Sequence, residues 1–213
     1  MKKLNRRNAL KTGILGSLAG LTSISNSQAK TSPTPSQIEG PYYPIKEQKD
    51  KDFDLTIIKG NTERAKGDII WITGKILDTD GNTIEDATVE LWQANQNGRY
   101  NHPHETNTAP LDPNFQGWAI VPSGKNGEFK FKSIMPGAYP ISKTVTRPPH
   151  IHFKVSKFGY KALTTQMYFE GNPLNKKDNL LARAGEHSDM LIAKKDPKNK
   201  GHYIFEIVLA EAV

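Results

Sequence analysis

The sequence predicts an all-β fold, an antiparallel β-sandwich with long loops and little helix. Three observations carry this prediction. Short segments alternate apolar and polar side chains with the period of two that is typical of a half-buried strand. These segments are rich in β-branched and aromatic residues, and Gly, Pro, Asn and Asp separate them as turn residues. No long stretch has a convincing helical period, and no internal repeat is visible.

The first expected strands have the clearest pattern. Residues 68–78 are rich in β-branched and aromatic side chains and end at a Thr-Asp-Gly-Asn turn signal. In the next strand, Val89 and Leu91 point to one face while Glu90 and Trp92 point to the other. The full set of expected strands is 68–78, 88–93, 128–134, 151–155, 164–169 and 203–209.

Little of the chain is expected to be helical, and one domain is expected to hold all the strands. The best helix candidate, residues 177–194, is interrupted by Gly185 and predicts one short helix or a loop. Residues 30–67 begin with a polar, proline-rich stretch and are expected to form an extended segment that packs on the core. Residues 68–213 are then the β-sandwich domain.

The first 29 residues have the layout of a secretory signal peptide. A basic start that includes Arg6 and Arg7 precedes an apolar run over 13–24, and a Ser-Gln-Ala sequence at 27–29 supplies a cleavage site. The apolar run is too short and too rich in glycine to remain as a membrane span. The two arginines are similar to a twin-arginine signal, with an ordinary signal peptide as the alternative. We therefore expect an exported protein, periplasmic or extracellular, with no membrane association after signal removal.

Composition excludes several kinds of site and partner. None of the 213 residues is a cysteine, so a disulfide framework, a thiolate nucleophile and a cysteine-based metal site are all excluded. The formal net charge is +7, but five of the 29 Lys and Arg lie in the signal peptide, which has no acid. The other 24 face 22 Asp and Glu, so there is no electrostatic reason to expect a nucleic-acid partner.

Two histidines at the start of the fourth expected strand, one directly before it and one within it, are candidate metal ligands. His150 and His152 are two residues apart, so in a strand their side chains share one face, about 6–7 Å apart. Two imidazoles on a stiff backbone suit a metal ion, although ordinary hydrogen-bonded histidines have the same spacing. A second pair, His102 and His104, lies in a polar loop and is expected to be solvated.

Three further residues become candidate site residues when they are considered together with this histidine pair. Tyr100 follows the strand that contains Trp92, and Tyr139 precedes Pro140, which favours an extended backbone. Arg147 stands three residues before His150. Taken singly, each has an ordinary interpretation as a packed tyrosine or a surface charge.

Six blocks of sequence together carry a family resemblance that no single motif would. In their order along the chain, the sequence resembles the intradiol ring-cleavage dioxygenases, above all the iron-bearing β chain of the protocatechuate 3,4-dioxygenases. The blocks are TPSQIEGPYYP (34–44), VELWQANQNGRYNHP (89–103), LDPNF (111–115), IMPGAYP (134–140), RPPHIHF (147–153) and TTQMYFEGNP (164–173).

The resemblance implies a non-haem Fe(III) enzyme that cleaves the ring of a catechol, such as protocatechuate, with O2 to a cis,cis-muconate. It implies that Tyr139 is both a ligand and a catalytic residue, and that Arg147 is catalytic through stabilisation of negative charge on the ring. Residues that line the substrate pocket would be Gln166, Trp92 and Ile141. The four implied iron ligands are Tyr100, Tyr139, His150 and His152.

The resemblance leaves the substrate and the assembly open. The protocatechuate enzymes have a tryptophan where this chain has Ile141, so the wall of the substrate pocket is expected to differ from theirs. Many of them pair two homologous chains, whereas here the block at 34–44 precedes the ligands on the same chain, which is consistent with a homo-oligomer.

Two other functions remain as alternatives. Residues 74–93 are also similar to transthyretin-type domains, so the sandwich core is expected to be transthyretin-like (prealbumin-like). The same similarity permits a non-catalytic binding module on this scaffold. The last alternative is a zinc or copper enzyme that uses His150, His152 and a carboxylate.

Overall fold

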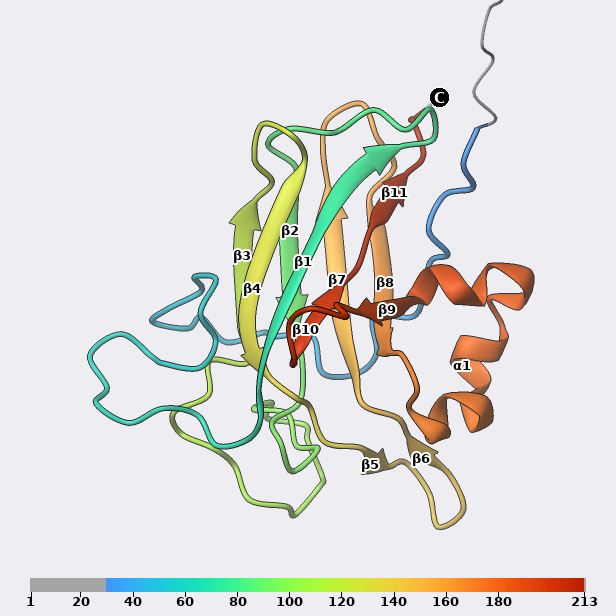
Figure 1. Ribbon diagram of the computed structural model, residues 1–213. Helices are drawn as coiled ribbons and strands as arrows, with labels where there is room; N and C mark the ends of the chain where they lie inside the picture. Colours follow the sequence, from blue (N-terminus) through green and yellow to red (C-terminus); the bar gives the residue numbers. More distant parts are fainter. Residues whose placement is uncertain (1–29, 213) are drawn as a thin grey trace, which may run out of the picture.

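Strands dominate the structure and helix is scarce, so the all-β prediction is confirmed (Figure 1). The computed structural model describes residues 30–212, and the expected signal peptide, 1–29, lies outside the described residues. The strands are β1 (Ile69–Asp78), β2 (Thr88–Trp92), β3 (Trp118–Pro122), β4 (Glu128–Ile134), β5 (Tyr139–Pro140), β6 (Thr146–Arg147), β7 (His150–Ser156), β8 (Leu163–Phe169), β9 (Ile192–Lys195), β10 (His202–Ile204) and β11 (Ile207–Leu209).

The strands pair in a way that the sequence did not predict. Nine of them form one mixed sheet in the order β11-β1-β10-β9-β8-β7-β2-β3, with β4 paired to β1, and β5 and β6 form a separate two-stranded ladder. Three pairs are parallel: β1 with β10, β1 with β11, and β8 with β9. The expected antiparallel sandwich is therefore wrong in this respect, because the C-terminal strands return beside β1 in its own direction. The result is a mixed, nearly closed, barrel-like sheet.

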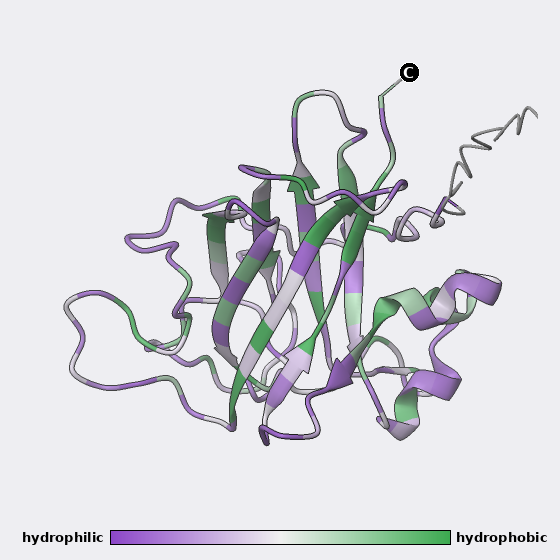
Figure 2. Cartoon of the chain, turned by 45° about the horizontal axis from the view of Figure 1, so that its top comes forward, coloured by the Kyte–Doolittle hydropathy of each residue, from purple (hydrophilic) through white to green (hydrophobic). Residues whose placement is uncertain are grey.

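The core lies where β1 and β4 cross in front of β2 and β7 (Figure 1). Phe131 of β4 and Phe153 of β7 are fully buried, and their ring centroids lie 6.1 Å apart. Ile72 and Leu91 are buried from β1 and β2. Full burial of each such side chain stabilises the fold by about 1.5–3 kcal/mol. Green and purple alternate along the strands in Figure 2, as the period of two predicts.

The last expected strand, 203–209, forms as two strands, β10 and β11, and the chain between them packs closely on Gly74 of β1. A Cβ at Gly74 of β1 would overlap the carbonyl oxygen of Phe205. The N–H of Phe205 donates to the carbonyl of Thr73 (2.9 Å), so the chain approaches β1 most closely between β10 and β11. The two strands therefore pair with different halves of β1.

The helical residues gather on one side of β8 and β9 (Figure 1). They are the 3₁₀ turn η1 (Pro173–Lys177), the α-helix α1 (Asn179–Ala182) and the 3₁₀ segment η2 (Gly185–Leu191). The candidate helix 177–194 therefore contains one short α-helix, and its last residues already belong to β9. Among residues 30–212, no helix has the length and apolarity that crossing a bilayer requires.

Residues 30–67 contain no named helix or strand and run along the sheet. The N–H of Thr34 donates to the carbonyl of Val208 (3.0 Å), that of Gln37 to Thr164 (2.9 Å), and that of Leu55 to Lys132 (2.8 Å). Each of these bonds ties the segment to a different strand.

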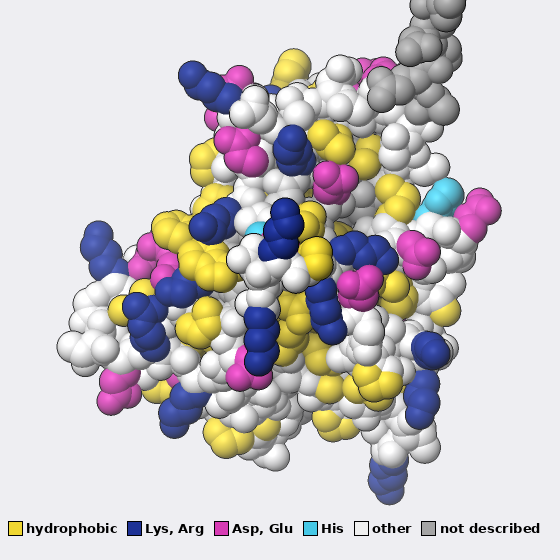
Figure 3. Space-filling model, in the orientation of Figure 1, with side chains coloured by type: hydrophobic (Ala, Val, Ile, Leu, Met, Phe, Trp, Pro, Cys, Tyr) yellow, Lys and Arg dark blue, Asp and Glu magenta, His cyan; other side chains and the backbone are white. Residues whose placement is uncertain are grey.

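The charged surface in the view of Figure 3 mixes Lys and Arg with Asp and Glu.

Candidate metal centre and substrate cavity

The two candidate histidines lie on the face of β7 that points away from the core. Ile151 and Phe153 fill the core, while His150 and His152 are buried on the other face with ring centroids 5.1 Å apart. In the sheet, His152 stands opposite Trp92 of β2 on one side and Gln166 of β8 on the other. The indole of Trp92 stacks on His152 at 4.8 Å and 11°, which fixes the orientation of that imidazole.

Two loops bring the candidate tyrosines to these histidines. Tyr100 comes from the loop after β2, and Tyr139 begins β5; their ring centroids lie 5.8 Å apart. The hydroxyl of Tyr139 lies 3.4 Å from Nε2 of His150, and the rings of Tyr100 and His152 lie 6.2 Å apart. Gly98 permits this arrangement, because a Cβ there would lie 2.9 Å from the Cβ of Tyr139, and its φ of 73° is in the left-handed region.

Burial keeps the imidazoles neutral, which leaves nitrogen lone pairs for a metal. Burial and the nearby Arg147 cation lower the pKa of His150 to about 3. Burial, then His150, holds the pKa of His152 well below its ordinary value. Nδ1 of His150 lies 2.7 Å from the carbonyl of Pro148 and donates its proton there, so the lone pair is on Nε2, which faces Tyr139.

The two phenols are also neutral in this arrangement. Burial, then the neighbouring Tyr139, raises the pKa of Tyr100 well above its ordinary value. Burial likewise raises the pKa of Tyr139, although the Arg147 cation opposes it. The cluster therefore holds four uncharged donors, and a bound cation would have to displace the phenol protons.

Two polar atoms of this cluster are buried without a hydrogen bond. Within residues 30–212, neither the hydroxyl of Tyr100 nor Nδ1 of His152 has a hydrogen-bond partner. Buried polar groups without partners are uncommon and require an explanation. Phenol oxygens and imidazole nitrogens are donors that suit a ferric ion, so the donor set fits the implied metal.

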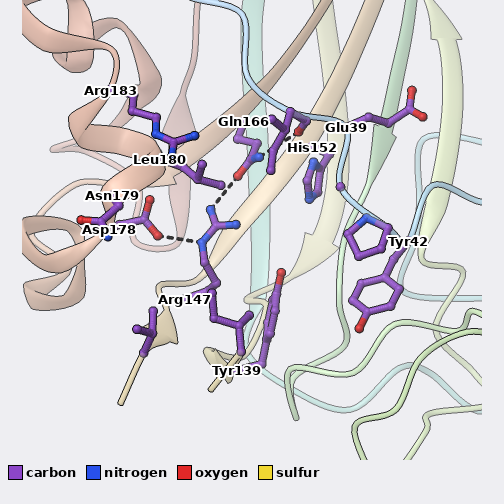
Figure 4. Close-up of a pocket in the computed structure, with 15 residues that line it drawn as sticks. Glu39, Tyr42, Tyr139, Arg147, His152, Gln166, Asp178, Asn179, Leu180 and Arg183 are labelled. Atoms are coloured by element: carbon purple, nitrogen blue, oxygen red, sulfur yellow. Dashed lines mark hydrogen bonds and ion pairs between the residues drawn. The ribbon is translucent and has the colours of Figure 1, made fainter. Parts of the chain in front are cut away.

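A cavity of about 380 Å³ opens onto this cluster (Figure 4). Tyr139 and His152 line the cavity, whereas Tyr100 and His150 lie behind them. The other lining residues come from the 38–42 segment, the loop between β5 and β6, β6, β8, and α1 with its two capping residues: Ile38, Glu39, Gly40, Pro41, Tyr42, Ile141, Val145, Arg147, Gln166, Asp178, Asn179, Leu180 and Arg183.

Arg147 reaches the cavity from β6, directly opposite Tyr139 in the small ladder. Its Nε donates to Asp178 (2.7 Å), and its Nη2 donates to Gln166 (2.7 Å) and Tyr168 (3.0 Å). Burial alone would lower the pKa of Arg147, but Tyr168 and Asp178 outweigh it and raise the pKa, so the guanidinium is always charged.

The sequence-predicted residues divide into those that line the cavity and those that do not. Gln166 lines it, but its Oε1 accepts from Arg147 and its Nε2 donates to the carbonyl of Ile38 (2.9 Å). Ile141 lines the mouth and is 60% exposed. Trp92 is buried behind His152 and does not line the cavity.

His102 and His104 lie outside the cavity, and the described residues offer no carboxylate for the alternative zinc or copper site. His102 and His104 lie in the loop with ring centroids 5.3 Å apart, outside the cavity lining. In the part of the chain that the structure describes, no three His, Asp or Glu side chains gather as metal ligands. The pair His150 and His152 thus has no carboxylate beside it to complete a zinc or copper site.

Sequence reasoning missed three residues around Arg147 and the cavity mouth. Asp178 pairs with Arg147, Tyr168 donates to Asp178 (3.2 Å), and Arg183 extends from the end of α1 (Figure 4). A signal existed for Asp178 as a helix N-cap, since it precedes the apolar residues of 179–182. Nothing in the sequence connected it with an arginine 31 positions earlier.

The comparisons with known proteins agree with this geometry. Residues 38–211 match a protein family described as Dioxygenase. The protocatechuate 3,4-dioxygenase beta chain of Burkholderia cepacia is 38% identical over 179 residues, which cover 79% of this chain and 76% of the relative. A chlorocatechol 1,2-dioxygenase of Cupriavidus pinatubonensis is 34% identical over 151 residues, 63% of this chain but only 54% of the longer relative.

A solved structure extends the similarity to the fold. The dioxygenase domain of a dioxygenase carbohydrate-binding protein fusion from Streptomyces sp. SirexAA-E superposes with a TM-score of 0.63 at 27% identity. The match covers 85% of this chain and 100% of that domain. Sequence blocks, fold and cavity thus lead to one assignment: the chain belongs to the intradiol ring-cleavage dioxygenases, a family of oxidoreductases.

Proposed function

We propose that this dioxygenase uses a non-haem Fe(III) ion and O2 to cleave the ring of a small catechol, with a protocatechuate-like substrate and a cis,cis-muconate product. The bond between the two hydroxylated carbons breaks, and each of these carbons gains one atom of O2, so no external reductant is needed. The convergence of Tyr100, Tyr139, His150 and His152 at the inner end of the cavity carries the proposal.

The donor set supports ferric iron on grounds of charge. Tyr100, Tyr139, His150 and His152 would hold the ion, with two phenolates that offset most of its charge in a buried site. When bound, the ion supplies a Lewis acid that activates the catecholate ring towards O2.

Two residues of the cavity wall would act on the substrate. Of the two tyrosines, only Tyr139 lines the cavity, so its phenolate is the one that can accept a proton from an arriving catechol. Arg147 stands opposite Tyr139 in the ladder and offers a fixed cation that stabilises negative charge developing on the ring.

The charges around the cavity favour a substrate with an acidic substituent. Arg147 pairs with Asp178 at 2.7 Å, and Glu39 pairs with Lys154 at 3.2 Å. Arg183 makes no hydrogen bond or ion pair with its side chain to any residue of the described range 30–212. One positive charge at the mouth is therefore unbalanced, which suits a ring carboxylate such as that of protocatechuate.

A spectroscopic and an oxygen-uptake experiment test the proposal together. Purified protein loaded with iron should have a broad visible band from tyrosinate-to-iron charge transfer, and it should consume O2 with protocatechuate, catechol or hydroxyquinol. Tyr139→Phe should shift this band and lower activity, because it removes one phenolate from the cluster. Tyr203→Phe, which changes a buried tyrosine packed on Phe169, should leave the band unchanged.

Other outcomes would favour the alternatives. Iron bound tightly without the visible band would contradict the four-ligand site. Zinc or copper at one per chain with iron absent would favour a different metal enzyme. Absence of any metal together with no oxygen uptake would favour a binding module.

We also propose that residues 1–29 export the protein to the periplasm or beyond, which rests on the basic start, the apolar run and the cleavage sequence. Cell fractionation tests this, and Arg6→Lys with Arg7→Lys tests dependence on the twin-arginine pair. Export that persists in the double variant would point to an ordinary signal peptide.

A further inference from the structure

The guanidinium of Arg147 is fixed along one edge only. Nε donates to Asp178, and Nη2 donates to Gln166 and Tyr168, at distances of 2.7 to 3.0 Å. Nη1 makes no hydrogen bond to any residue within 30–212, and Arg147 lines the cavity. The three bonded acceptors thus decide where the remaining N–H groups point.

Asp178 is the charged member of these acceptors, and both of its oxygens are occupied. Oδ2 accepts from Arg147, while Oδ1 accepts from the hydroxyl of Tyr168 (3.2 Å) and from the N–H of Leu181 (2.8 Å). The side chains of Arg147 and Asp178 are 8% and 2% exposed, so the ion pair is largely shielded from solvent. Figure 4 shows the carboxylate beside the guanidinium at the wall of the cavity.

The same carboxylate is the N-cap of α1, which supplies another part of the wall. Asn179 and Leu180 of this helix and Arg183 at its C-terminal end line the cavity. Asp178 therefore connects the orientation of the cation to the position of the helix at the mouth.

We propose that Asp178 is a positioning residue for the ring-cleavage reaction, which holds Arg147 with its free N–H groups directed at the substrate ring. The inference rests on the proposed function, since it gives Arg147 its task in the reaction. Asp178 need not touch the substrate; it acts through the arginine.

The choice of variant separates this role from helix capping. Asn is as good an N-cap as Asp, so Asp178→Asn retains the acceptor for Leu181. The amide of asparagine has one acceptor and one donor group. In either orientation its NH₂ group faces another donor, which is Nε–H of Arg147 on one side or the groups that donate to Oδ1 on the other, and the arginine loses its counter-ion. Asn172→Ala is the matched control: it removes the cap of η1, whose acceptor bonds only Leu174, and it leaves Arg147 untouched.

Kinetics and NMR on the full chain test the proposal. In the iron-loaded protein, Asp178→Asn should lower kcat on the order of 10- to 100-fold with KM little changed, because the arginine acts in the transition state. In the metal-free protein, the Nε–H signal of Arg147, identified by its loss in Arg147→Lys, should be protected from solvent exchange. Asp178→Asn should shift this signal or broaden it by exchange, whereas Asn172→Ala should leave both signal and kcat unchanged.

Three results would overturn the proposal: an unchanged Nε–H signal in Asp178→Asn, an unchanged kcat in that variant, or an equal fall in kcat in Asn172→Ala. Failure of the proposed function has a different signature, namely no oxygen uptake by the unaltered protein with any catechol. The NMR comparison is independent of metal and substrate, so the two failures are distinguishable. If Asp178→Asn does not fold, Asp178→Ser, which also caps α1 but is too short to reach Arg147, replaces it.

Discussion

Arg183 is the single residue on which we expect discrimination between catechols to depend. Its cation lines the cavity without an acidic partner in the described chain, so a ring carboxylate would be its natural partner. Arg183→Gln should raise KM for protocatechuate by about tenfold, because the substrate loses one exposed charge-assisted hydrogen bond. KM for catechol, which has no carboxylate, should not change. Steady-state oxygen uptake with both substrates measures this.

The control for that variant is Lys177→Gln, which removes an exposed positive charge from η1 outside the cavity lining. Equal effects of both variants on protocatechuate would mean that long-range attraction, and not contact with Arg183, selects the anion. An equal rise of KM for catechol in Arg183→Gln would mean that the residue shapes the cavity rather than recognising a carboxylate.

Single residues differ in how far the sequence reveals them. The shared face of His150 and His152 follows from the period of a strand, and β7 confirms it. Tyr100 lies in a loop and Tyr139 in the two-residue strand β5, so no periodicity could join them to β7, and only the family resemblance did. Neither periodicity nor the family resemblance identified Asp178, because its contact with Arg147 depends on how the segment after β8 folds back over the cavity.

At the scale of elements, the turn after β1 gives a prediction about stability and pH. Asp78 is 6% exposed and accepts from the N–H groups of Asp80 and Asn82 and from the side chain of Asn82. Burial alone would raise the pKa of Asp78, but these hydrogen bonds outweigh it and lower the pKa. Its stabilisation is therefore complete above the unfolded-state pKa, about 3.9, and is lost as the pH falls through the lower, folded-state pKa.

Asp78→Asn should lower the free energy of unfolding by about 1–2 kcal/mol at neutral pH, because the new amide opposes the donor of Asn82. The difference between the variant and the unaltered protein should shrink as the pH falls below about 4. Urea unfolding at several pH values measures it. A difference that stays constant down to pH 2 would show that the charge of Asp78 contributes nothing.

Elements also differ in how clearly the sequence specifies them. β1, β2, β4, β7 and β8 form within one residue of the expected bounds, because alternation or a high content of β-branched and aromatic residues marks each of them. β3 is a continuous apolar run that ends in Pro122, which periodicity cannot separate from a loop or a buried helix. β9 has only four residues, and it is a strand because β8 and β10 flank it.

For the whole molecule, sequence patterns gave the class of fold but not the pairing of its strands. Parallel contact between β1 and the C-terminal strands joins Trp71 with His202 and Ile76 with Ile207. Side-chain alternation states which face is buried, but it is the same for parallel and antiparallel neighbours. The direction of β10 and β11 depends on the route of the preceding chain, which local sequence does not encode.

This long-range arrangement leads to a prediction for metal loading. The four donors come from the loop after β2, from β5 and from β7, so they meet only in the folded chain. An ion that binds the folded state alone stabilises it by about 4 kcal/mol at a thousandfold excess over Kd. For a protein of this size, that corresponds to a rise in Tm of about 8–16 °C, which calorimetry of iron-loaded and metal-free protein would detect.

The rise in Tm should itself depend on pH. Burial raises the pKa of both Tyr100 and Tyr139, so binding must displace their protons and weakens as the pH falls. The rise in Tm on iron loading should therefore be larger at pH 8 than at pH 6. Tyr139→Phe lacks one of the two phenol protons and one ligand, so its rise in Tm should be smaller and should depend less on pH. An increment that is equal at both pH values, or unchanged in Tyr139→Phe, would mean that iron binds elsewhere on the chain and that the buried phenols are not its ligands.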